Sequence, residues 1–136
     1  MDQLRAGHRT WARFSMIAAA VVIFAHGLVH LMGVALLWKL GEPGQLRYVD
    51  AVPAPGTTAG YLVGGLWLVA AALFVTVAVL VMARQPAWRL AALAGVAVSA
   101  AVIGLAPGQA MAGLVVDGLV LGFVVASWLR DRAVAS

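Results

Sequence analysis

The sequence predicts an all-α, polytopic membrane protein: a four-transmembrane-helix bundle that forms a single domain over residues 1–136. Hydrophobic residues make up 64 % of the chain and charged residues only 10 %, whereas a soluble domain is about half apolar and about a quarter charged. The hydrophobic residues gather into four long runs, and about 20 helical residues cross the roughly 30 Å hydrocarbon core of a bilayer. We therefore expect transmembrane helices over residues 14–40, 59–83, 88–106 and 109–129.

Each run has the character of a membrane span. The first carries two histidines and, before Lys39 near its end, no charged residue; the second carries no charge at all. The third is the shortest and is rich in alanine, and the fourth contains one acidic residue, Asp117. The ten-residue alternation of barrel strands is absent, so helices are the expected spans. The five prolines all lie between the runs, where a helix breaker does little harm: Pro43, Pro53, Pro55, Pro86 and Pro107.

Basic residues indicate how the bundle is oriented. Seven of the nine lysines and arginines flank the chain termini or the turn near Gln85, whereas the connection after the first run offers only Arg47, with Lys39 just before it. By the positive-inside rule, both termini and the turn near Gln85 face the cytoplasm. The net charge of +4 on so apolar a chain points to the lipid bilayer and not to nucleic acid. Tryptophans lie at the ends of the predicted helices, as in an aromatic belt: Trp11, Trp38, Trp88 and Trp128.

A few polar-capable side chains lie deep within the predicted spans. His26 falls at the middle of the first helix, and His30 lies about 6 Å nearer the outer face. Asp117 on the fourth helix, Ser99 on the third and Trp67 on the second fall in the same outer half. Each helix thus contributes to one layer, and these five residues are the candidate site for a ligand or a proton.

The spacing of the two histidines bears on the chemistry of that layer. His26 and His30 are four residues apart and share one helical face, so they suit two ligands of one divalent metal, with Asp117 as a third. Haem is disfavoured, because two axial histidines must approach from opposite sides. The same residues are also compatible with hydrogen bonds between helices, in which neutral imidazoles join the first helix to a neighbour, or with a proton or a quinone-like ligand. An unpaired carboxyl group in lipid is costly, so Asp117 should be protonated or paired, with the histidines as partners.

Two segments carry a family resemblance. The run from His26 to Gly33 (HGLVHLMG) and the later run from Gly60 to Leu68 (GYLVGGLWL) resemble small four-helix bacterial inner-membrane proteins and, more loosely, the DoxX-like family. The resemblance covers the first two helices and implies a four-helix fold in the bacterial plasma (inner) membrane. Some DoxX-like proteins are linked to quinol oxidation or thiol-stress complexes. The acidic residue expected early in the second helix of that family is replaced here by Tyr61 or Leu62, so no catalytic residue is carried over.

Three functions fit these features. The chain carries no recognisable nucleotide-binding, metalloprotease or nucleophile motif, and Gly60-xxx-Gly64 and Gly118-xxx-Gly122 predict close helix contacts. The first hypothesis is therefore a non-enzymatic accessory or assembly subunit, in a homo-oligomer or a larger membrane complex. The second makes His26, His30 and Asp117 a working site for a metal ion, a proton or a quinone-like molecule. The third is a small transporter, which would have to oligomerise.

Overall fold

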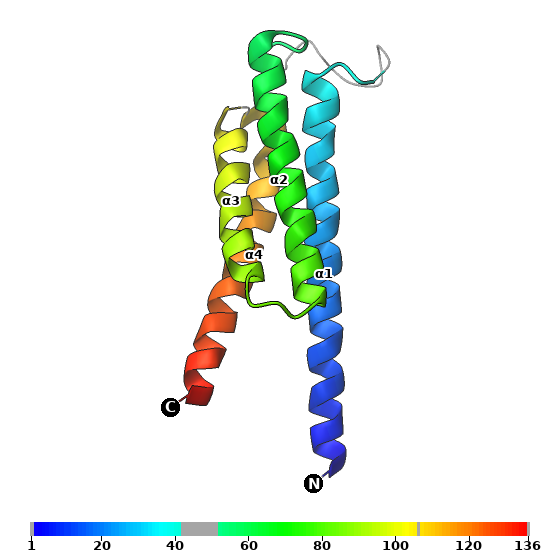
Figure 1. Ribbon diagram of the computed structural model, residues 1–136, viewed down its shortest axis with the longest axis vertical. Coiled ribbons are helices and arrows are strands. Elements are labelled where there is room, and N and C mark those ends of the chain that lie inside the picture. The colour runs from blue at the N-terminus through cyan, green and yellow to red at the C-terminus, as the bar shows by residue number, and fades with distance from the viewer. Residues whose placement is uncertain (1, 42–51, 106, 136) are drawn as a thin grey trace.

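The computed structural model describes residues 2–41, 52–105 and 107–135, with side chains described for residues 14–41, 52–105 and 112–133. All regular structure within these ranges is helical (Figure 1): α1 (Asp2–Leu37), α2 (Thr58–Met82), α3 (Trp88–Leu105) and α4 (Pro107–Ala135). The four predicted helices are therefore confirmed. Each contains a stretch long and apolar enough to cross a membrane, at Phe14–Leu37, Thr58–Met82, Trp88–Leu105 and Ala112–Ala133.

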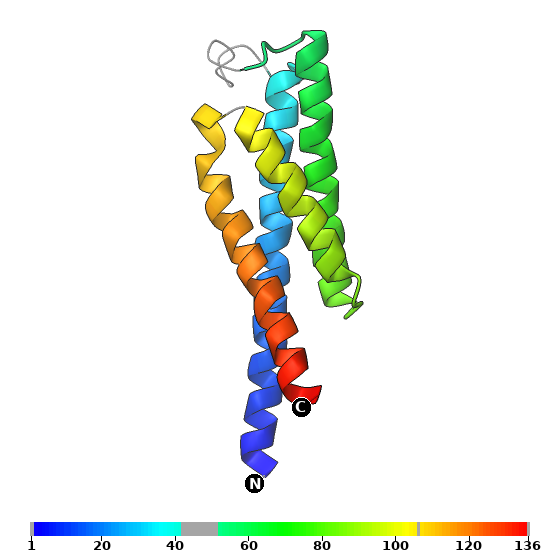
Figure 2. The same ribbon diagram turned by 90° about the vertical axis from the view of Figure 1, so that its left-hand side faces the viewer.

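The helices alternate in direction along the chain. The α2–α3 turn lies at the same end of the bundle as the start of α1 and the end of α4 (Figure 1). Helices that follow one another pack side by side, most extensively α1 with α2, whereas α4 packs mainly on α3 and meets α1 at few positions (Figure 2). Correspondingly, 17 % of the α4 span is buried in the protein, against 39 % of the α1 span.

Two helices extend beyond the apolar runs that predicted them. α1 begins at Asp2, twelve residues before the predicted start, and α4 continues to Ala135, past the predicted end at residue 129. Charged residues in these extensions lower their hydrophobicity, so hydrophobic runs alone do not predict these helical turns. The arginines and alanines of the extensions are nevertheless good helix formers. α4 also begins earlier than predicted, at Pro107, because proline lacks an N–H that the first helical turn does not need.

The end of α1 is set by backbone hydrogen bonds. The helix ends at Leu37, three residues before the predicted end. The N–H of Lys39 donates to Leu36 O at 3.3 Å, and that of Leu40 donates to Ala35 O at 2.9 Å, the pattern of a Schellman motif. Lys39 has a φ of 53°, a left-handed conformation that glycine usually supplies. The same motif ends α2.

The apolar core forms two clusters, one on each side of a buried polar layer. By position along the helices, the cluster nearer the α2–α3 turn includes Ile23, Phe74, Val96 and Val124, and the cluster nearer the other end includes Val34, Trp67, Val102 and Ile103. Between them lie the four buried polar or charged residues that the described side chains contain: His26, His30, Ser99 and Asp117.

Gly27 allows α1 and α2 to approach closely beside this layer. A Cβ atom at Gly27 would lie 3.1 Å from the Phe74 Cβ and 3.2 Å from the Ala71 carbonyl oxygen of α2. Backbones come this near only where one residue has no side chain. The approach brings the α2 aromatic rings against the histidines of α1.

The two predicted glycine motifs behave differently. In the first, Gly64 lies directly against the indole of Trp38, so the motif makes a close contact with the end of α1. In the second, Gly118 and Gly122 face open space, and a Cβ atom at either would meet nothing within 4 Å. The close contact that we expected at Gly118-xxx-Gly122 is therefore not made with any of the residues that the structure describes.

Candidate functional site

The candidate site joins three helices through side chains that are almost completely buried. His26 is 7 % exposed, His30 2 %, Asp117 3 % and Ser99 0 %. Polar groups buried this deeply are stable only where they have partners, because no water is available to replace a missing hydrogen bond. The structure brings together four of the five candidate residues through hydrogen bonds, and the fifth, Trp67, through ring contact.

His26 binds Asp117 across the bundle. The His26 Nε2 atom lies 3.0 Å from the Asp117 Oδ1 atom, and both side chains are about 5 % exposed. This bond links α1 to α4 where the two helices otherwise meet at few positions. The pair therefore fixes the placement of α4 relative to α1 and holds a carboxyl group within the apolar spans.

His30 is held in one orientation by two hydrogen bonds. Its Nδ1 atom lies 2.9 Å from the backbone carbonyl oxygen of His26, and its Nε2 atom lies 3.0 Å from the Ser99 hydroxyl oxygen. Because a carbonyl oxygen only accepts, His30 Nδ1 carries the proton and donates it. In the neutral imidazole Nε2 is then an acceptor, and Ser99 Oγ donates to it. The bond joins α1 to α3.

α2 contributes aromatic rings to the site. Phe74 packs against both imidazoles, with its ring centroid 4.7 Å from that of His26 and 5.3 Å from that of His30. The two imidazoles meet nearly edge to face at 4.6 Å, and Trp67 lies 5.2 Å from His30. These distances are typical of packed aromatic pairs. Sequence analysis missed Phe74, although it lies seven residues after Trp67, a spacing that places both on one face of α2.

Trp67 is placed by a glycine of α1. A Cβ atom at Gly33 would lie 2.5 Å from the Trp67 Cδ2 atom, so the indole occupies the space that a side chain would need. Gly33 follows His26 and His30 on the same helical face. Trp67 therefore serves as an apolar wall beside His30.

One buried oxygen of the site has no hydrogen-bond partner. Asp117 Oδ2 is inaccessible to solvent and unbonded, one of two such side-chain atoms in the described part of the chain. Few buried polar groups in folded proteins are left in this state, because the desolvation cost is about 1–3 kcal/mol. One oxygen of the carboxyl group therefore binds His26, and the other has no hydrogen-bond partner.

The geometry differs from the metal site that the histidine spacing allows. No group of three or more His, Asp or Glu among the described side chains is arranged to hold a metal ion. Both ring nitrogens of His30 are bonded, to the His26 carbonyl group and to Ser99, and His26 Nε2 is bonded to Asp117. Spacing along α1 places both imidazoles on one face, but their rotamers direct them to different helices.

Comparison of the chain with protein-family models, curated proteins and solved structures finds no match. The resemblance to DoxX-like proteins stays a prediction from the sequence.

Proposed function

We propose that this protein binds and releases a proton within the membrane, at the pair formed by His26 and Asp117. The observation that carries the proposal is the combination of a buried histidine–carboxyl hydrogen bond at 3.0 Å with a buried carboxyl oxygen that has no partner. Ionisable groups at membrane depth are costly, and they commonly mark proton or ion pathways.

The hydrogen bond defines where the proton moves. An imidazole nitrogen and a carboxyl oxygen 3.0 Å apart share one proton, which lies on His26 Nε2 in one state and on Asp117 Oδ1 in the other. Asp117 Oδ2 offers a second position for a proton on the same carboxyl group. His30 takes no part in this exchange in its observed orientation, since its bonds to the His26 carbonyl group and to Ser99 hold it in place.

The packing favours a proton over a larger ligand. Phe74 and the two imidazoles lie in mutual ring contact, and Ser99 and Phe74 are completely buried. A proton enters this arrangement without displacing any side chain, whereas a quinone-like molecule or a metal ion with its ligand shell requires the rings to separate. The four helices long and apolar enough to cross a membrane support a site within a bilayer, and the positive-inside rule supports an inner-membrane location with cytoplasmic termini.

Infrared difference spectroscopy during a pH titration of the full chain in lipid tests the proposal. The wild-type protein should show a change in the carboxyl band of a buried aspartate. Asp117→Asn, which keeps the shape and an acceptor oxygen, should abolish that change. Asp131→Asn is the matched control, because Asp131 is an exposed aspartate of the same helix, and it should retain the buried band. Retention of the band in Asp117→Asn, or its absence from the wild-type protein, would overturn the proposal.

The open face of α4 favours a second candidate, an accessory or assembly subunit of a homo-oligomer or larger membrane complex. Gly118 and Gly122 lie one turn apart with free space before them, and small residues at this spacing allow helices to pack closely in membranes. Crosslinking from a cysteine introduced at Val115, an exposed position of α4, should then capture a protein neighbour. Gly118→Leu should abolish that crosslink, and Gly65→Leu should preserve it, because Gly65 on α2 also faces open space.

A further inference from the structure

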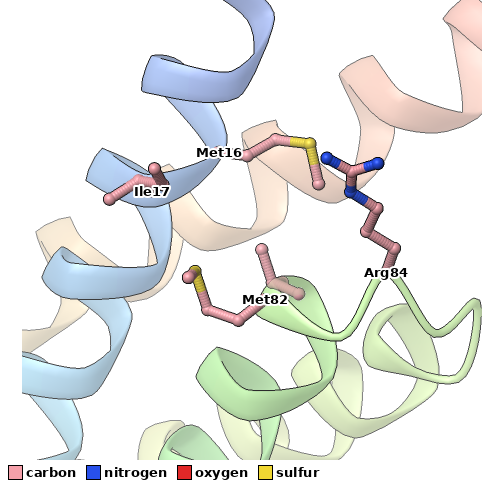
Figure 3. Close-up of a pocket in the computed structure, with 5 residues that line it drawn as sticks. Met16, Ile17, Met82 and Arg84 are labelled. Carbon is pink, nitrogen blue, oxygen red and sulfur yellow. The ribbon is translucent and has the colours of Figure 1, made fainter.

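A small hollow lies at the end of the bundle that carries the α2–α3 turn. It has a volume of about 160 Å³ and is lined by Met16 and Ile17 of α1, Val81 and Met82 of α2, and Arg84 of the turn (Figure 3). Residues of the first apolar cluster, among them Ile23, Phe74 and Val77, lie between this hollow and the polar layer. It is therefore separate from the His26–Asp117 pair.

The hollow lies where the apolar spans end. Met16 and Ile17 belong to the first turn of the α1 span, which begins at Phe14, and Met82 is the last residue of the α2 span. Arg84 follows two residues later. In a bilayer this level is the boundary between acyl chains and headgroups. The apolar residues would then face the methylene groups nearest the headgroups, and the guanidinium group of Arg84 would face the phosphates.

The end of α2 fixes the position of Arg84. The N–H of Arg84 donates to Val81 O at 3.1 Å, and that of Gln85 donates to Leu80 O at 2.9 Å, which completes a Schellman motif. Arg84 takes the left-handed position of this motif, with a φ of 56°. Its side chain runs from the turn toward α1, beside Met16 (Figure 3).

Arg84 makes no ion pair with a described carboxyl group. The acidic side chains among the described residues are Asp117 and Asp131; the first binds His26, and the second binds Arg89 at 2.5 Å. No carboxyl group in the described part of the chain therefore neutralises Arg84. A guanidinium group binds phosphate oxygens through a planar fork of donors.

We propose that this hollow binds an anionic phospholipid, with its phosphate on Arg84 and its uppermost acyl methylene groups against Met16, Ile17 and Met82. Methionine side chains are flexible and adapt to irregular apolar partners such as acyl chains. The four apolar lining residues offer nothing to a free inorganic anion, which gains only the contact with Arg84. The combination of one cation and an apolar wall thus selects a lipid.

Native mass spectrometry of the full chain in a neutral detergent measures this preference. Phosphatidylglycerol and phosphatidylcholine with identical acyl chains are added separately, and the first bound lipid is quantified. A basic residue near an anionic surface contributes about 1 kcal/mol, which is about fivefold in affinity. The wild-type protein should therefore bind phosphatidylglycerol about fivefold more tightly than phosphatidylcholine. Arg84→Gln should bring the ratio to within about twofold of unity.

Matched variants distinguish lipid binding in this hollow from a general attraction of anionic lipid to the basic residues of the protein. Arg132→Gln removes an exposed arginine at the same end of the bundle and should leave the fivefold ratio intact. Met82→Trp fills the hollow and should weaken both lipids, whereas Val79→Trp, at an exposed position one turn earlier in α2, should weaken neither. An equal loss of preference in Arg132→Gln and Arg84→Gln would overturn the proposal, as would unchanged binding in Met82→Trp.

Two further outcomes would assign the hollow to another occupant. If inorganic phosphate protects the folded protein against heat as well as phosphatidylglycerol does, and loses that effect in Arg84→Gln, the ligand is a free anion and the lipid proposal is wrong. If the spectrum instead shows a lipid-free dimer that disappears in Arg84→Gln, the hollow binds a second copy of the chain. If neither inorganic phosphate nor dimer formation displaces phosphatidylglycerol, the result supports binding of the lipid.

Discussion

Removing either partner of the His26–Asp117 pair should have unequal effects on stability. Asp117→Ala leaves His26 Nε2 without an acceptor, but it also removes Asp117 Oδ2, which already lacks a partner. The two effects oppose each other, so the net loss should be about 1 kcal/mol. His26→Leu keeps an apolar side chain against Phe74 but leaves both carboxyl oxygens buried and unpartnered. The Oδ1 atom that loses its partner costs about 1–3 kcal/mol, and no unpartnered atom is removed in return, so this variant should lose more stability than Asp117→Ala.

Unfolding in mixed micelles, followed by tryptophan fluorescence as the denaturing detergent is raised, measures both free energies. His26→Leu should unfold well before Asp117→Ala, and the double variant should recover most of the loss because the stranded carboxyl group is gone. Asp117→Asn should stay close to the wild-type protein, since an amide oxygen still accepts from His26 Nε2. If Asp117→Ala were the more destabilising variant, or if the double variant recovered nothing, the assignment of Oδ2 as the unpartnered atom would be refuted.

Three further predictions use the same unfolding measurement. Gly33→Ala should lose about 1–3 kcal/mol, because its Cβ would lie 2.5 Å from the Trp67 ring, whereas Gly118→Ala, with nothing within 4 Å, should be neutral or stabilising; equal effects would contradict the packing. Lys39→Gly should be about 1 kcal/mol more stable than Lys39→Ala, because only glycine accepts a φ of 53° without strain; the reverse order would contradict the Schellman end. Ser99→Ala should lower the free energy of unfolding by about 1 kcal/mol, because it leaves His30 Nε2 without a partner. An unchanged free energy of unfolding would contradict the bond between His30 and Ser99.

The spans could be predicted from the sequence because lipid imposes a single requirement on a long stretch of chain. Four apolar runs of sufficient length and the prolines between them placed four helices correctly. The helix ends could not be placed as well. α1 stops at Leu37 because the chain turns at Lys39, and a Schellman motif without glycine leaves little trace in the sequence.

The members of the site were accessible to sequence reasoning, but their bonds were not. His26, His30, Ser99 and Asp117 stand out because polar groups are rare at depth in apolar spans, and helical rise places them near one level. Whether the imidazoles converge on a metal ion or bind separate helices depends on rotamers and on helix rotation. Phe74 was missed for a related reason: the outer faces of this bundle are also apolar, so hydrophobicity does not distinguish a side chain that lines a site from one that faces outward.

The most direct test of a proton site at His26 and Asp117 is nitrogen NMR of the full chain with ¹⁵N-labelled histidine in lipid bilayers. Each imidazole is assigned by its loss in a His→Gln variant. A proton should be located on His30 Nδ1, which donates to the His26 carbonyl oxygen, whereas the His26 Nε2 resonance should report a hydrogen bond to a carboxyl group and should change in Asp117→Asn. A His26 Nε2 resonance that does not respond to Asp117→Asn would contradict the account.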